Sequence, residues 1–135
     1  MYRQLLSAVG LAAIVSIAGS PASVSAVDVI KADNADNLNL GSSWVGGVTP
    51  GSGDVAVWNS TIGTGPNTTL LGADTNWAGI RIANPIDAVT ISAGNILTNG
   101  VSGIDMSAAT TNLTIGAGVS LGGAQSWNVA ADRTL

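Results

Sequence analysis

Short segments in which apolar and polar residues alternate recur at a constant spacing through the second half of the chain. Residues 79–82 correspond to 103–106 and residues 89–91 to 113–115, each at an offset of 24, as in 103−79 and 113−89. A third copy opens at Trp127, whose offset from Ile104 is 127−104 = 23. A period of this length is typical of stacked-repeat proteins. None of these segments has the helical period of about 3.6 residues, so we predict a β-solenoid.

Each repeat unit holds three short apolar segments, the third of them around Leu97 and Leu121 (121−97 = 24). Because successive side chains of a strand point to opposite faces, alternation predicts which residues face the core. The residues expected to point inward are Ile80, Ile82, Val89, Ile91, Ile104, Met106, Leu113 and Ile115. Those expected to point outward are Arg81, Thr90, Asp105, Thr114 and Asn128. The common offset stacks Arg81 beside Asp105, about 4.8 Å apart on neighbouring rungs, with Asn128 next.

The segments before the repeats predict further strands and loops. Residues 55–58 alternate as a strand, residues 68–73 are strand-like, and residues 27–39 form a polar lead-in that holds at most one short strand. Gly-rich and Pro-containing loops cover residues 41–53 and 61–67. We expect the regular coil to begin near Trp77 and the chain to be almost entirely β.

The N-terminus has the pattern of a secretory signal peptide, residues 1–26. Arg3 supplies the positive charge, residues 5–18 are apolar, and small residues end at Ala26. The apolar run (18−5+1 = 14) is shorter than the roughly 20 residues that span a bilayer, so we expect cleavage rather than anchoring. This predicts an exported protein, extracellular or associated with the outer membrane surface, with no membrane span after cleavage.

The part that remains after cleavage, residues 27–135, divides in two. Residues 27–54 are the expected lead-in and cap, and residues 55–135 the solenoid repeats. A solenoid needs a terminal cap with a polar outer face, and none follows the third copy. We therefore expect the chain to be the N-terminal piece of a longer protein, whose further repeats would stack on it.

Charge and composition narrow the function classes. Without Arg3 the chain has three basic and eight acidic residues, a net charge of 3−8 = −5, which disfavours a nucleic-acid partner. It has no Cys and no His, so it lacks the usual ligands of a transition metal. A Ser nucleophile would have only Lys31 as a base, in a segment that we expect to be disordered. We predict no catalytic, cofactor-binding or metal-binding residue.

Other clusters have both a functional and a structural interpretation. The four residues that could bind Ca²⁺ are Asp28, Asp33, Asp36 and Asp54, but their spacing matches no calcium loop. We interpret them as solvated loop residues, with Asp54 stabilising a turn. Four tryptophans could stack on sugars: Trp44, Trp58, Trp77 and Trp127. We prefer the interpretation that they cap the open end of the solenoid and pack its corners. An ice-binding face is disfavoured because only Thr90 and Thr114 align.

Residues 44–58, with the sequence WVGGVTPGSGDVAVW, have the spacing W-x-G-G-x-x-P-x-x-x-D-x-A-x-W. This segment resembles the opening of bacterial autotransporter-associated β-strand repeat proteins, and the rhythm of residues 76–129 is similar to their early repeats. The resemblance implies a right-handed parallel β-helix in an exported surface protein. Together with the repeat period, we expect an N-terminal cap and about three rungs, each as long as that period. The family has no shared catalytic motif and supplies no functional residue.

Two functions therefore stay open. The first is a non-enzymatic structural or adhesive segment, the N-terminal start of a surface-exposed β-helical protein. Its partners would be surface glycans or other cell-surface proteins. The alternative is the N-terminal part of a secreted polysaccharide-active β-helix enzyme or a carbohydrate-binding module, with Arg81 and Asp105 in a sugar groove. Charged or aromatic residues gathered on one repeat face would favour the alternative.

Overall fold

The computed structural model describes residues 25–65 and 67–135. The predicted signal peptide lies outside the described residues except for its last two positions. Within the described part, no helix is long and apolar enough to cross a membrane. The elements in chain order are β1 (Val27–Ile30), the 3₁₀ helix η1 (Gly41–Ser43), β2 (Asp54–Trp58), β3 (Asn67–Thr69), β4 (Thr75–Ile82), β5 (Val89–Ile91), β6 (Ile96–Met106), β7 (Leu113–Ile115), β8 (Gly118–Leu121) and β9 (Trp127–Val129).

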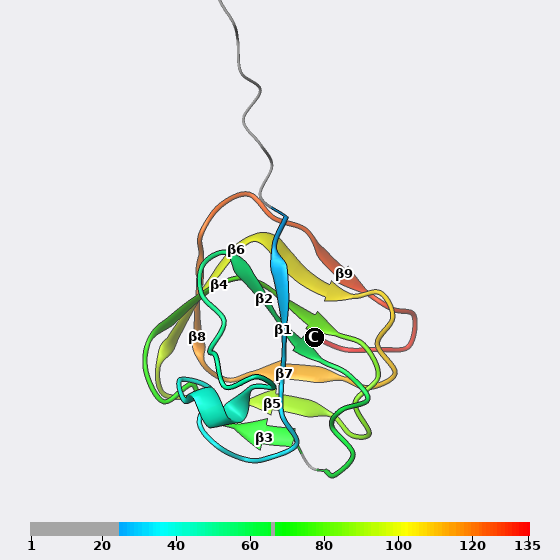
Figure 1. Ribbon diagram of the computed structural model, residues 1–135. Helices are drawn as coiled ribbons and strands as arrows, with labels where there is room; N and C mark the ends of the chain where they lie inside the picture. The colour runs from blue at the N-terminus through cyan, green and yellow to red at the C-terminus, as the bar shows by residue number, and fades with distance from the viewer. Residues whose placement is uncertain (1–24, 66) are drawn as a thin grey trace, which may run out of the picture.

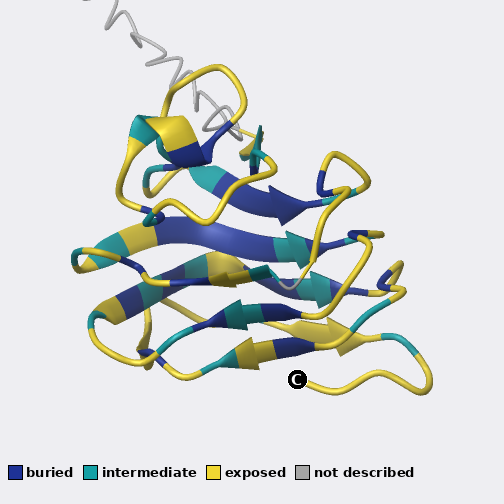
Figure 2. Ribbon diagram, turned by 90° about the horizontal axis from the view of Figure 1, so that it is seen from below, coloured by how far each residue is buried: buried dark blue, intermediate teal, exposed yellow. Residues whose placement is uncertain are grey.

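The strands form two parallel sheets that wind together as a parallel β-helix. The larger sheet has the order β1-β2-β4-β6-β8, with β9 also paired to β6, and the smaller has the order β3-β5-β7. Figure 1 looks along the coil, and Figure 2 shows its turns stacked from η1 at the top to the C-terminus at the bottom. The predicted all-β parallel solenoid is thus confirmed.

The coil has about four turns, one more than the expected three. The additional turn begins in the polar lead-in, because β1 pairs with β2 from Val27↔Asp54 to Ile30↔Val57. The repeat period did not reveal it, since the offset from β1 to β2 is 54−27 = 27 rather than 24.

The register matches the predicted period on two sides of the coil and departs from it on the third. Ile80 pairs with Ile104 and Val89 with Leu113, both at the predicted offset of 24. The expected stacking of Leu97 on Leu121 is wrong, because Leu97 pairs with Val119 at an offset of 119−97 = 22. The reason is the corner length: four residues separate β5 from β6, and only two separate β7 from β8.

The third expected segment of one unit, around Leu97, also joins the first segment of the next unit, residues 103–106, in one strand. β6 runs for 11 residues around a corner of the coil, through Gly100 and Gly103. Gly103 has a φ of 65°, and a Cβ there would overlap the carbonyl oxygen of Ser126 on the next turn. Only glycine permits this backbone conformation and this close approach, so the corner depends on it.

The core lies inside the coil and consists of stacked apolar side chains. Seven of the eight predicted inward residues are at most 1% exposed, and Ile115, near the last turn, is half-buried. At the N-terminal end the Trp44 ring stands edge-on to Trp58 and Trp77, with centroid distances of 5.8 Å to each. The Trp44 Nε1 donates a hydrogen bond to the Leu38 carbonyl at 2.8 Å. The capping interpretation is confirmed for these three tryptophans, whereas Trp127 is exposed.

Candidate functional site

The most organised group of charges lies on the outer face of the larger sheet, where Arg81 stands between two carboxylates. Arg81 and Asp105 are register partners on β4 and β6, with Nε 3.4 Å from Oδ2. Asp105 pairs in turn with Asn128 on β9, so the predicted outward file is confirmed. The Arg81 Nη1 also donates a hydrogen bond to the Asp28 Oδ2 on β1. The structure therefore joins three turns through one guanidinium.

Sequence reasoning missed Asp28 as a partner of Arg81. Arg81 is in register with Val57 of β2, and Val57 is in register with Ile30 of β1, so register alone does not place Asp28 beside Arg81. Because β2 lies between β1 and β4, the Arg81 side chain must cross β2 to reach Asp28. The outward residues of β2, Val55 and Val57, are only 5% and 4% exposed. This burial agrees with the aliphatic part of the Arg81 side chain lying over them.

Hydrogen bonds hold the Asp105 carboxylate in its ionised form. Both the backbone N–H and the hydroxyl of Ser107 donate to its Oδ1, at 3.0 and 2.6 Å. These bonds, followed by the charge of Arg81, place the pKa of Asp105 below its ordinary value. A carboxyl group with a lowered pKa is a poor proton donor near neutral pH, so this arrangement favours an ion pair over acid catalysis.

Side-chain oxygens at the corners of the coil accept hydrogen bonds from the backbone of the adjacent turn. Asp33 accepts from the Gly63 N–H at 3.2 Å and from the Thr64 hydroxyl at 2.7 Å, and the Thr64 bond is the main cause of its lowered pKa. The other bonds of this kind join Asp74 to the Ile96 N–H, Asn84 to the Ser60 N–H and Asn112 to the Thr134 N–H, at 2.9, 3.1 and 3.1 Å. We call these contacts the corner staples.

The four aspartates weighed as a calcium site are not brought together. Asp28 pairs with Arg81, Asp33 is a corner staple, and Asp36 accepts a hydrogen bond from the Ser42 hydroxyl at 2.6 Å. Asp54 accepts from the Gly51 N–H at 2.9 Å, as expected for a carboxylate that stabilises a turn. Among the described residues, no three carboxylates gather where a metal ion could be held.

Lys31 is ordered and buried, so the expectation of a disordered segment around it is wrong. Its side chain is 1% exposed, and Nζ donates to the carbonyl of Ala32 and to the carbonyl and Oδ1 of Asn34, at 2.8, 2.8 and 2.9 Å. Burial lowers the pKa of Lys31, and the charges of Asp36 and Asp33 oppose this shift. The polar composition of residues 27–39 suggested a solvated segment. In the structure, a tight loop instead directs the carbonyls of Ala32 and Asn34 toward the Lys31 ammonium, which donates hydrogen bonds to them.

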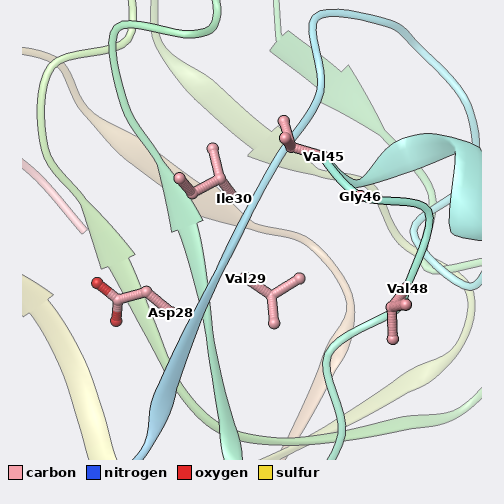
Figure 3. Close-up of a pocket in the computed structure, with 6 residues that line it drawn as sticks. All are labelled: Asp28, Val29, Ile30, Val45, Gly46 and Val48. Carbon is pink, nitrogen blue, oxygen red and sulfur yellow. The ribbon is translucent and has the colours of Figure 1, made fainter.

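A shallow groove of about 170 Å³ lies on the surface beside β1. Figure 3 shows its lining, which comes from the strand and from the loop after η1: Asp28, Val29, Ile30, Val45, Gly46 and Val48. Sites for drug-sized ligands occupy about 300–1,000 Å³. The groove is therefore too small to enclose such a ligand.

On the smaller sheet, three threonines rather than two form one file. Thr68 pairs with Thr90, and Thr90 with Thr114. The repeat offset of 24 residues did not predict Thr68 as part of this file, because Thr68 lies 90−68 = 22 residues before Thr90. The residues on either side of Thr90, Val89 and Ile91, point into the core, so the sheet presents one row of hydroxyls rather than a flat array.

The arrangement as a whole joins successive turns through an ion-pair file and corner staples, while the buried Lys31 orders the loop after β1. The resemblance to autotransporter-associated repeat proteins stays an expectation, because comparison of the chain with family models, curated proteins and solved structures gave no match.

Proposed function

We propose that this chain is an exported, non-enzymatic structural segment, the start of a surface-exposed β-helix that presents its outer faces to surface glycans or cell-surface proteins. The main support for this proposal is that charged side chains bind other groups of the same chain and hold its turns together. Arg81 binds both Asp28 and Asp105, and the carboxylates of Asp33 and Asp74 bind backbone N–H groups of the adjacent turn.

A β-helix suits this role because its stability comes from nearest-neighbour contacts between turns. The stacked core and corner staples hold the coil rigid, while the corner loops lie on the surface and tolerate change. Such loops include residues 45–48 and 84–87, where Val48 and Ile86 are exposed. The resemblance of residues 44–58 to the opening of autotransporter-associated repeat proteins points to the same role.

Export is tested by expressing the full-length chain with a C-terminal tag in a Gram-negative bacterium and measuring the intact mass of the protein outside the cytoplasm. We expect the mature chain to begin at Val27, after loss of residues 1–26. Replacing Ile14 by Asp breaks the apolar run and should leave the uncleaved chain inside the cell. A wild-type chain that stays uncleaved in the cytoplasm would rule out the proposed localisation.

The absence of enzymatic activity is tested by incubating the purified protein with acidic and neutral polysaccharides and measuring released reducing ends and unsaturated products. We expect no release above the rate of a heat-denatured control. Turnover that disappears in the Arg81→Ala variant would replace the proposal by the polysaccharide-active alternative. Glycan binding without turnover, measured on the same panel, fits an adhesive role.

A further inference from the structure

The outer edge of β1 is only partly covered by the rest of the chain. Because the Lys31 N–H donates to the Val57 carbonyl at 2.8 Å, Lys31 and every second residue before it direct their backbone groups toward β2. The backbone groups of Asp28 and Ile30 therefore point away from the sheet. Within the described part of the chain, only the Ile30 carbonyl of these groups is bonded, by the Val45 N–H at 2.8 Å. The Asp28 N–H, the Asp28 carbonyl and the Ile30 N–H form a row that is open to a further strand.

The loop that forms the cap leaves this edge halfway along β1. Residues 43–45 run antiparallel to the end of β1, where Trp44 bridges Lys31. Gly46 and Gly47 follow with φ values of 89° and 76°, which turn the chain out of the extended conformation. The loop therefore stops short of Asp28, and the space beside the first half of β1 is the shallow groove described above.

The wall of the groove is apolar on the side where a guest side chain would lie. Val45 and Val48 are 53% and 68% exposed, and Val29 packs its inner side on the core. Figure 3 shows Val29 on the side of β1 that faces Val48, and Asp28 on the opposite side. A guest strand that pairs with Asp28 and Ile30 places its intervening residue beside Val29, on the same face. The groove then receives one aliphatic side chain, which suits its small size.

The charges at this end of the coil favour a basic peptide as the occupant. Residues 25–58 contain four of the eight aspartates, and the two cations near them, Lys31 and Arg81, leave a net charge of 2−4 = −2. A second copy of the chain is acidic, and antiparallel pairing through the same edge would bring its own Asp28 toward the first, which like charges oppose. A row of N–H, C=O and N–H groups is complemented by another peptide backbone.

We propose that the open edge of β1 is a docking site for an extended, positively charged peptide segment of a partner protein. The segment adds one short strand to the larger sheet, places an aliphatic side chain in the groove and directs its basic side chains to the outer face near Asp28. The backbone bonds supply affinity, and the groove and the acidic surroundings supply specificity. The proposal rests on the fold and not on the proposed function.

The test measures binding of short synthetic peptides with blocked ends to the full-length chain by calorimetric titration. The probe is a peptide in which lysine and valine alternate, so that an extended conformation presents the valines on one face. Replacing its valines by serine should weaken binding about tenfold, because the aliphatic side chain in the groove is lost. Replacing its lysines by glutamate should abolish binding, and added salt should weaken binding of the probe.

A matched pair of variants locates the site. Val48→Lys removes an apolar wall of the groove and adds a positive charge there, so it should weaken binding of the probe at least about tenfold. Val101→Lys makes the same substitution at a valine that is 70% exposed on β6, which β2 and β4 separate from β1. It changes the net charge equally and should leave binding nearly unchanged.

Hydrogen exchange on the same samples identifies the paired edge. Addition of the probe should protect the amides of Asp28 and Ile30. No binding, equal binding of the serine peptide, or protection at β8 or β9 instead would each overturn the proposal. So would protection of these two amides before the probe is added, because another segment of the same chain would then cover the edge. Protection that rises with protein concentration alone would show that a second copy occupies it.

Discussion

Ile104 and Asp105 are neighbours on β6 but contribute to stability by different physical effects. Ile104 points into the core at 1% exposure and stacks between Ile80 and Trp127. Asp105 points outward to Arg81 in an ion pair that stays partly solvated, with side chains 38% and 39% exposed. Burial of an aliphatic side chain stabilises by kilocalories, whereas an exposed ion pair mainly selects the register.

The first prediction compares alanine variants of these two neighbours. Ile104→Ala should lower the free energy of unfolding by about 2–5 kcal/mol, because it leaves a cavity between two turns. Asp105→Ala should lower it by only about 0.2–1 kcal/mol. Chemical denaturation followed by circular dichroism measures both. Equal losses would contradict the assignment of the inner and outer faces of β6.

The second prediction concerns acid. The pKa of Asp105 is lower in the folded chain than its ordinary value, so the unfolded chain binds the proton first as the pH falls. The stabilisation is therefore complete above the unfolded pKa of about 4 and is lost as the pH falls through the folded pKa. Asp105→Asn should make the acid-induced loss of stability shallower, as measured by denaturation at a series of pH values.

Ser107→Ala supplies an independent check of the acid prediction. It removes the hydroxyl that is the first cause of the lowered pKa of Asp105, while the carboxylate stays in place. The acid limb should again become shallower, by less than in Asp105→Asn. An acid limb identical to that of the wild type in both variants would mean that other carboxylates determine it.

At the scale of elements, the loop between β1 and β2 forms a cap that covers part of the N-terminal end of the coil. Trp44 lies across the core, Ser43 and Val45 pair with the edge of β1, and Lys31 satisfies three carbonyl and amide oxygens beneath them. A cap of this kind covers part of a sheet edge that would otherwise bind another strand. It therefore protects the end of β1 that carries Ile30.

The third prediction tests the role of Lys31 in this cap. Lys31→Met keeps the length of the side chain but removes the donor of three partly buried hydrogen bonds, to the carbonyls of Ala32 and Asn34 and to the Asn34 Oδ1. We expect the free energy of unfolding to fall by about 1–3 kcal/mol or more. The amides of Ala32 and Val45, which join the cap to β1, should exchange faster. Arg133→Met, at an exposed position of the last turn, is the control and should change stability by less than about 0.5 kcal/mol.

At the scale of the molecule, stability should vary along the axis of the coil. β4 and β6 have a strand on both sides in the larger sheet, whereas β8 has one only on one side. Every residue of β8 and β9 is exposed, in contrast to the mostly buried β2 and β4. In a stacked structure, each turn is stabilised by its nearest neighbours, so the last turn should open first.

The fourth prediction is therefore a gradient of hydrogen exchange along the axis of the coil. The amides of β8 and β9 should exchange fastest, those of β4 and the paired part of β6 slowest, and β1 should be intermediate because the cap covers part of its edge. Exchange of all strands at one common rate would indicate a single cooperative unit and would contradict the gradient.

The sequence by itself determined where most strands lie, which way their side chains point, and that Arg81 and Asp105 stack. These features follow from a local rule, the alternation of side chains along a strand, applied again at a constant period. The inward files of β4 to β7 could be read from the chain because every turn repeats the rule. Asp54 was also predictable, since a carboxylate that binds a backbone N–H close by in the sequence is a local contact.

Only the tertiary structure decided the features that depend on which segments lie side by side. The first turn, the burial of Lys31, the reach of Arg81 to Asp28 and the pairing of Leu97 with Val119 belong to this group. Each depends on how many residues a corner takes or how a long side chain crosses a neighbouring strand. Corner length changes the register without disturbing alternation, so the pattern of the chain stays the same while its partners change.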